Sequence, residues 1–119
     1  MTFEDPLVLR SDRADGLTTL TLNRPGQFNS LSKDMLTALQ AELDAIPASE
    51  GVRVVVIAGA GKAFCAGHDL KEMRANHDKD FMQALFRQCG DLMLTLTRMP
   101  QPVIARVHGI ATAAGCQLV

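Results

Sequence analysis

Residues 54–73 read VVVIAGAGKAFCAGHDLKEM, and this stretch decides the fold. The segment Val52 to Ala58, where this stretch begins, is too apolar for a strand with one solvent-exposed face. We therefore expect a central strand covered on both faces. The apolar run breaks at Gly59-Ala60-Gly61 and tightens again at Gly67. A polar-faced helix is then expected over residues 70–75. Backbone N–H groups at such a turn can bind an electron-rich group.

The N–H groups near Ala66 and His68 should point outward unpaired, because they precede the first turn of a helix. A second glycine- and alanine-rich turn lies at residues 109–115, where Ala113, Ala114 and Gly115 are all small. Small side chains let a ligand lie directly on the backbone. Two such turns, each donating one N–H to one carbonyl oxygen, would form an oxyanion hole. Sequence alone leaves open whether the turns converge, and each is also what an ordinary strand-to-helix connection looks like.

The N-terminal part of the chain predicts a hairpin followed by a helix. Leu7 to Arg10 and Leu17 to Leu22 read as strands around the turn Asp15-Gly16. Ser32 is the expected N-cap of a helix that ends at Pro47. Apolar residues recur along that helix at spacings of three and four, at Met35, Leu36, Leu39, Leu43 and Ile46.

The second half predicts a long helix and a further strand. The helix would pass through Gly90, which weakens its propensity, and stop before Pro100. Its apolar face comprises Phe81, Leu85, Cys89, Leu92, Leu96 and Met99. Val103 to Val107 is the next expected strand. The order strand, strand, helix, strand, turn, helix, strand predicts an α/β fold with crossover connections.

Composition excludes several classes of function. The 119 residues fit one domain, with 47% apolar residues, 21% charged residues and a formal net charge of −1. Disorder and strong attraction to nucleic acid or anionic membranes are therefore not expected. The three cysteines lack a metal-binding spacing, so we expect no metal site and a compartment that keeps thiols reduced. Residues 1–10 do not resemble a secretory signal, and no apolar run is long enough to span a bilayer.

Three segments together resemble a known family. They are LNRPGQFNSLSKDML at residues 22–36, the stretch at 54–73 quoted above, and PVIARVHGIATAAGCQLV at 102–119. Their order and spacing are similar to those of the N-terminal half of the enoyl-CoA hydratase/isomerase, or crotonase, superfamily. The resemblance implies a crotonase-like β-β-α spiral, with residues 1–119 as a partial acyl-CoA-binding domain truncated after its N-terminal half. It also implies that the full-length protein is a homotrimer or hexamer. The expected location is the cytoplasm, or the mitochondrial matrix if a transit peptide is missing from this sequence.

The resemblance also implies roles for particular residues. The backbone N–H groups of His68 and Ala114 would hold the thioester oxygen, where an enolate develops. Contacts to coenzyme A (CoA) would come from a set that also includes Ala66, Asp69, Leu70, Lys71 and Gly115. CoA would enter as part of the substrate, with no separate cofactor. Members of the family are longer, so the 119-residue chain alone is expected to be inactive.

Several side chains keep a structural alternative beside the functional one. Asp69 can act in the site or cap the following helix, and we favour the cap. Lys71 can approach a CoA phosphate or remain a solvated lysine. For His68 we favour a role of the N–H over a catalytic imidazole. The remaining expectations are packing for Cys65 and Cys116, a structural or solvated role for His77 and His108, and a turn at Arg24 that could also approach the nucleotide.

Gln117 departs from the family pattern. Hydratases of the family carry a glutamate at the matching position, where it positions and deprotonates water. Gln117 can hydrogen-bond a water but cannot take a proton, and a missing general base forfeits a factor of roughly 10²–10⁴. Three hypotheses stay open: an acyl-CoA hydratase, isomerase or lyase; a non-catalytic acyl-CoA-binding or regulatory relative; and an interaction domain with no affinity for CoA thioesters.

Overall fold

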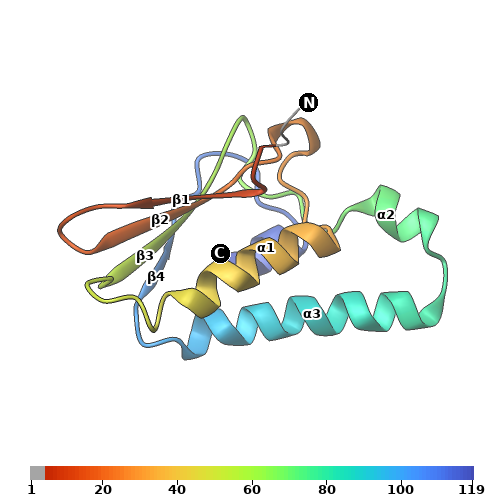
Figure 1. Ribbon diagram of the computed structural model, residues 1–119. Coiled ribbons are helices and arrows are strands. Elements are labelled where there is room, and N and C mark those ends of the chain that lie inside the picture. The colour runs from red at the N-terminus through yellow and green to blue at the C-terminus, as the bar shows by residue number, and fades with distance from the viewer. Residues whose placement is uncertain (1–4) are drawn as a thin grey trace.

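The computed structural model describes residues 5–119. Residues 1–4 lie outside the described residues. They belong to the segment 1–10, for which the sequence predicts no secretory signal. A four-stranded mixed sheet forms one layer, and two helices lie side by side along one of its faces (Figure 1). The expected α/β architecture with crossover connections is confirmed. No helix within residues 5–119 is long and apolar enough to cross a membrane.

The sheet has the order β1-β2-β3-β4. Its strands are β1 (Val8–Asp12), β2 (Leu17–Leu22), β3 (Val54–Gly59) and β4 (Val103–Ala105). The first two strands pair antiparallel, whereas β2, β3 and β4 run parallel. Parallel strands bring their carboxyl ends to the same edge of the sheet. The segments that leave β3 and β4 therefore start from one edge, and the candidate site lies there.

The β1–β2 hairpin forms as predicted, with its turn at Asp15-Gly16. Gly16 has φ +99°, a conformation that L side chains rarely adopt, and an added Cβ would lie 2.8 Å from the Gly51 carbonyl oxygen. The Gly16 carbonyl accepts the N–H groups of Arg53 and Val54 at 2.8 and 3.2 Å. The hairpin turn thus holds the start of β3 and sets the β2–β3 register.

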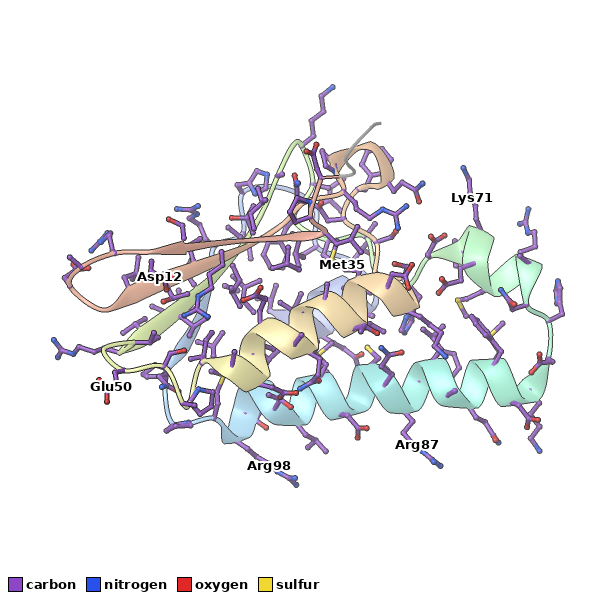
Figure 2. The ribbon with its side chains drawn as sticks, viewed as in Figure 1. Asp12, Met35, Glu50, Lys71, Arg87 and Arg98 are labelled. Atoms are coloured by element: carbon purple, nitrogen blue, oxygen red, sulfur yellow. The ribbon has the colours of Figure 1, made fainter. Side chains whose placement is uncertain are left out.

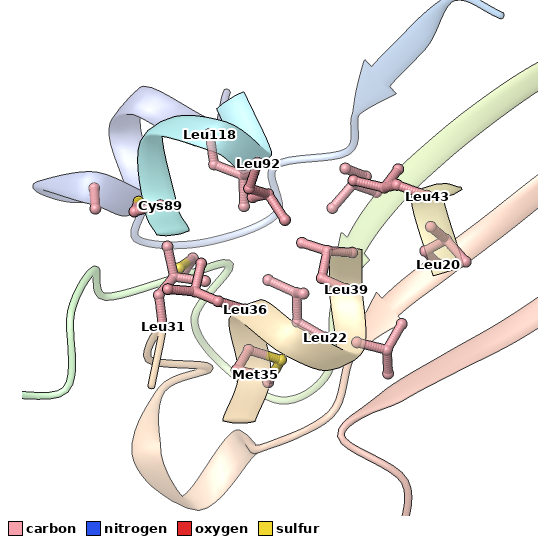
Figure 3. Close-up of a cluster of buried hydrophobic side chains, with 14 of the residues drawn as sticks. Leu20, Leu22, Leu31, Met35, Leu36, Leu39, Leu43, Cys89, Leu92 and Leu118 are labelled. Carbon is pink, nitrogen blue, oxygen red and sulfur yellow. The ribbon is translucent and has the colours of Figure 1, made fainter. Parts of the chain in front are cut away.

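Helix α1 (Lys33–Ala45) and helix α3 (Lys79–Arg98) cover the sheet on one face. The Ser32 side chain accepts the Met35 N–H at 3.1 Å, which confirms the predicted N-cap. The periodic apolar residues of α1 are buried against the sheet, and Figure 3 shows leucines of β2, α1 and α3 meeting in this core. Burial of these side chains supplies the main driving force for folding.

Both faces of β3 are buried, as the apolar run predicts. Val55 and Ile57 belong to the core under the helices, and Val56 and Ala58 on the opposite face are only 9% and 3% exposed. β4 is shorter than expected. Its last ladder bond runs from the Arg106 N–H to the Ile57 carbonyl at 2.8 Å, and the chain then leaves the sheet, so the prediction that the strand extends to Val107 is wrong.

The long helix α3 passes through Gly90 without a break. Gly90 is exposed, and an added Cβ would meet nothing within 4 Å, so no packing requirement explains a glycine there. Asp78 accepts the Phe81 N–H at 2.7 Å and caps the helix start. The helix ends at Arg98, just before Met99 and Pro100. Two short helices, α2 (Leu70–Ala75) and α4 (Ala114–Leu118), begin at the two glycine- and alanine-rich turns.

Candidate thioester-binding site

The turns that follow β3 and β4 lie in direct contact. Gly67 has φ +92°, and an added Cβ would lie 3.0 Å from the Ala113 Cβ and 3.2 Å from the Ala114 nitrogen. Such distances leave no room for a larger residue at Gly67. The sequence left open whether these segments converge, and in the structure they touch.

Backbone hydrogen bonds hold the two turns together. The Ile110 carbonyl accepts the N–H groups of Phe64 and Cys65 at 2.9 and 3.1 Å, and the Cys65 carbonyl accepts the Thr112 N–H at 3.1 Å. Gly115 packs against the Cys65 carbonyl so closely that an added Cβ would overlap it. The turns therefore form one hydrogen-bonded unit.

His68 and Ala114 each carry a free backbone N–H at this contact. Among residues 5–119, no acceptor is found for either group. Ala114 is the first residue of α4, so its N–H has no partner within the helix. The preceding Ala113 has φ 52° and ψ −124°, an uncommon conformation for a residue with a side chain. Such strained residues cluster at functional sites, where the surrounding structure holds them in place.

Two neighbouring N–H groups are not free. The Ala66 N–H donates to the Phe28 carbonyl at 3.0 Å, so the expectation that it points outward unpaired is wrong. The Gly115 N–H donates to the Thr112 carbonyl at 2.8 Å, within the turn that starts α4. Gly115 instead makes room for the Cys65 carbonyl, as described above.

A groove of about 300 Å³ runs beside the first turn. Ala66, His68, Asp69, Leu70 and Lys71, the expected CoA-binding positions of that turn, all line it. Ala114 and Gly115 are not part of its lining and adjoin it through Gly67. The opposite wall of the groove consists of Gly26, Gln27, Phe28 and Ser30, which follow β2. The sequence did not predict this wall, because no local pattern in that loop indicates that it faces residues 66–71.

Asp69 caps α2, which the sequence favoured. One carboxylate oxygen, Oδ1, accepts the N–H groups of Lys71 and Glu72 at 3.0 and 3.2 Å. Lys71 is exposed, and Figure 2 shows its side chain extending away from α3 into solvent. Leu70 is 72% exposed. The groove thus has a rim formed by one apolar and one cationic side chain.

The His68 imidazole is half-buried and packs edge-to-face against the Phe86 ring of α3, with centroids 5.4 Å apart. Its Nδ1 is buried and has no hydrogen-bond partner among the described residues. The side chain therefore joins the turn to α3, while the backbone N–H of the same residue stays free.

Gln117 lies elsewhere. It is exposed on α4 and lines a separate groove of about 240 Å³ with α3 residues that include Met93 and Leu96. The structure thus brings together the two turns and the expected CoA-binding positions, but it places Gln117 in a different groove from His68.

Four further side chains, those of His108, Cys65, Cys116 and Arg24, lie outside the groove. His108 has a partner that the sequence did not reveal, because its Nε2 donates to the Gly61 carbonyl at 2.6 Å. Cys65 is buried as expected, whereas Cys116 is exposed, so the packing role predicted for Cys116 is wrong. Arg24 donates to the Ser32 hydroxyl at 3.4 Å and is not among the groove residues. Within residues 5–119, no group of three metal-ligating side chains lies close enough to hold an ion.

The fold and the paired turns define a protein of the crotonase class. A model of the enoyl-CoA hydratase/isomerase family matches residues 12–119, and the chain belongs to this family. The crystal structure of an enoyl-CoA hydratase from Mycobacterium smegmatis is 57% identical and superposes with a TM-score of 0.93, covering 96% of this chain and 44% of that one.

Curated relatives give the same result. The rat protein named enoyl-CoA hydratase domain-containing protein 3, mitochondrial, is 36% identical over 97% of this chain and 38% of its own length. The Escherichia coli 1,2-epoxyphenylacetyl-CoA isomerase is 35% identical over 87% of this chain and 40% of its own length. The chain therefore spans less than half the length of these relatives.

Proposed function

We propose that this chain binds an acyl-CoA thioester and stabilises the enolate that forms at its carbonyl, with the N–H groups of His68 and Ala114 as the donors. One observation carries the proposal: two free N–H groups belong to turns that are in contact through Gly67. Preorganised backbone donors stabilise a developing oxyanion without reorganisation, and losing one donor typically costs about 3–4 kcal/mol of transition-state stabilisation.

The CoA portion would occupy the groove beside the first turn. Leu70 offers an exposed apolar surface for a flat heterocycle, and Lys71 offers a cation for a phosphate. The groove adjoins the two turns, so a ligand bound there would extend toward the free N–H groups. Membership of the enoyl-CoA hydratase/isomerase family supports this assignment of the ligand class.

The alternative is a non-catalytic acyl-CoA-binding or regulatory relative. Gln117 favours it, because a carboxamide cannot accept a proton as a general base. Its place in a separate groove adds to this argument. Tight binding of crotonyl-CoA without turnover would support the alternative, and loss of crotonyl-CoA absorbance on adding the protein would support the enzyme.

The donor assignment is tested with a pair of adjacent variants. Ala114→Pro removes the N–H at the first position of α4, where no intrahelical hydrogen bond is lost. Ala113→Gly keeps that N–H and relieves the positive φ next to it. We expect Ala114→Pro to abolish the red shift of the thioester carbonyl stretch in bound butyryl-CoA, and Ala113→Gly to keep it. Equal shifts in the two variants would disprove the assignment.

A further inference from the structure

Asn29 is a buried polar residue beside the candidate site, and the proposed function gives it no role. It is 0% exposed and has φ 54°, directly after Phe28 with φ 53°. Two successive left-handed residues without glycine are costly, although asparagine tolerates this conformation better than most residues. A side chain kept at such a position must make interactions that offset this cost.

The Asn29 carboxamide joins two loops. Its Oδ1 accepts the Arg24 N–H at 2.8 Å. Its Nδ2 lies 2.9, 3.0 and 3.2 Å from the carbonyl oxygens of Ala60, Ala63 and Phe64. The orientation of the amide is fixed by this network, because a rotated carboxamide would direct its oxygen at three carbonyl oxygens. Asn29 therefore fixes the segment that leads from β3 into the first turn.

Backbone hydrogen bonds extend this attachment to the donor itself. The Phe28 carbonyl accepts the Ala66 N–H at 3.0 Å, and the Leu31 N–H donates to the Gly67 carbonyl at 2.6 Å. Residues on both sides of Asn29 thus hold the residues that immediately precede His68. The position of the His68 N–H depends on the backbone path that starts at the carboxamide.

The CoA-binding side of the turn has a separate anchor. Asp69 caps α2, and the Glu72 carboxylate accepts the Lys33 N–H at 3.0 Å, which ties α2 to α1. Loss of the Asn29 carboxamide should therefore move the His68 N–H more than it moves the residues that line the far end of the groove.

We infer that Asn29 is a positioning residue of the oxyanion hole: its carboxamide sets where the His68 N–H points, without touching the ligand. The inference rests on the proposed function. A misplacement of about 1 Å at a reacting group can cost roughly 10²-fold in rate, so a positioning residue affects carbonyl polarisation more than affinity. A residue that only stabilised the fold would show no such preference.

The test uses butyryl-CoA labelled with ¹³C at the carbonyl carbon, because a saturated acyl chain cannot be hydrated during the measurement. Isotope-edited infrared spectroscopy gives the shift of the carbonyl stretch on binding, and calorimetry gives the affinity for CoA alone. The variant is Asn29→Gly, which keeps the left-handed backbone available and removes only the carboxamide. Leu43→Ala, a substitution of a buried residue far along α1 from the loop, serves as a destabilising control.

The expected result is that N29G loses most of the carbonyl shift while its affinity for CoA changes by less than about threefold. Leu43→Ala should keep the full shift. A full shift in N29G, or an equal loss in Leu43→Ala, overturns the inference. Failure of the proposed function looks different, since wild-type protein would then bind butyryl-CoA without a shift or would not bind it.

A measurement on the unmutated chain keeps the inference open to disproof if N29G does not fold. A carboxamide that positions the donor before the ligand arrives must keep its hydrogen bonds in the free protein. We expect its two side-chain protons to exchange with solvent far more slowly than those of the exposed Gln27, two residues earlier. Exchange at the Gln27 rate would overturn the inference.

Discussion

The Glu72 carboxylate on α2 accepts the backbone N–H of Lys33, the first residue of α1, at 3.0 Å. The Lys33 ammonium in turn lies 5.3 Å from the centroid of the Phe81 ring on α3. A single residue at the start of α1 therefore contacts both helices that lie between β3 and β4 in the chain. The short helix α2 has no fully buried residue, and this junction adds to the packing of its half-buried Met73 against the core.

Glu72→Ala should cost about 1 kcal/mol of unfolding free energy, because it removes an acceptor and a negative charge from a helix N-terminus. Urea denaturation measures the loss, and amide exchange at Lys33 shows whether its N–H has become exposed. The exposed Arg74→Ala on the same helix is the control and should be nearly neutral. Equal effects of the two substitutions would contradict the assigned role of the carboxylate.

Two glycine-to-alanine substitutions should have opposite signs. Gly67→Ala meets the Ala113 side chain at a positive φ and should destabilise the protein by about 1–3 kcal/mol. Gly90→Ala enters open space on an exposed helical face and should stabilise it by about 0.5–1 kcal/mol. Thermal denaturation of both variants checks the signs. Stabilisation of the protein by Gly67→Ala would contradict the close approach of Gly67 to Ala113.

The three cysteines should react in two classes. Burial raises the pKa of the Cys65 thiol and that of the Cys89 thiol, which lowers their thiolate fractions, while Cys116 is exposed. A disulfide reagent at mildly alkaline pH should therefore modify Cys116 rapidly and the other two only after unfolding. Mass spectrometry of the peptides identifies each site. Rapid labelling of Cys65 in folded protein would contradict its burial beneath the second turn.

The β1–β2 hairpin should weaken in acid. The buried Thr18 hydroxyl donates to Asp12 at 2.7 Å, and this hydrogen bond holds the pKa of that carboxyl below its usual range. A carboxyl with a lowered folded-state pKa contributes stability that is present above its unfolded-state pKa and is lost as pH falls through the folded-state value. Thr18→Val should flatten the acid limb of a stability-against-pH curve. The neighbouring Thr19→Val should leave the limb unchanged.

Local signals in the sequence predicted most of the fold. Asp15-Gly16 indicated the hairpin, Ser32 and the periodic leucines indicated α1, and Asp69 indicated the start of α2, because turn chemistry, capping and periodicity each act within a few residues. The length of β4 was less predictable, because β3 continues to Gly59 and the end of β4 depends on where its own chain leaves the sheet. The Arg106–Ile57 bond determines that end.

The candidate site was predicted only in part, because it depends on long-range pairing. A free N–H near His68 was expected from a helix start, and the donor at Ala114 was expected from the family resemblance. Their convergence needed the parallel arrangement of β3 and β4. The bond from Ala66 to Phe28 and the bond from His108 to Gly61 join segments distant in the chain, and no local pattern announces them. Resemblance to a family supplied what residue patterns could not.

The two free donors of this site belong to the main chain, so they do not depend on which side chains stand at their positions. A main-chain N–H cannot be deleted by substitution, except by proline, so replacing the side chains of His68 or Ala114 leaves both donors in place. The positions that must not vary are those that shape the path, such as Gly67 and Gly115. Side chains such as that of Gln117, which cannot take a proton, can therefore be exchanged while both main-chain donors persist, so one backbone arrangement can be combined with different side-chain chemistry.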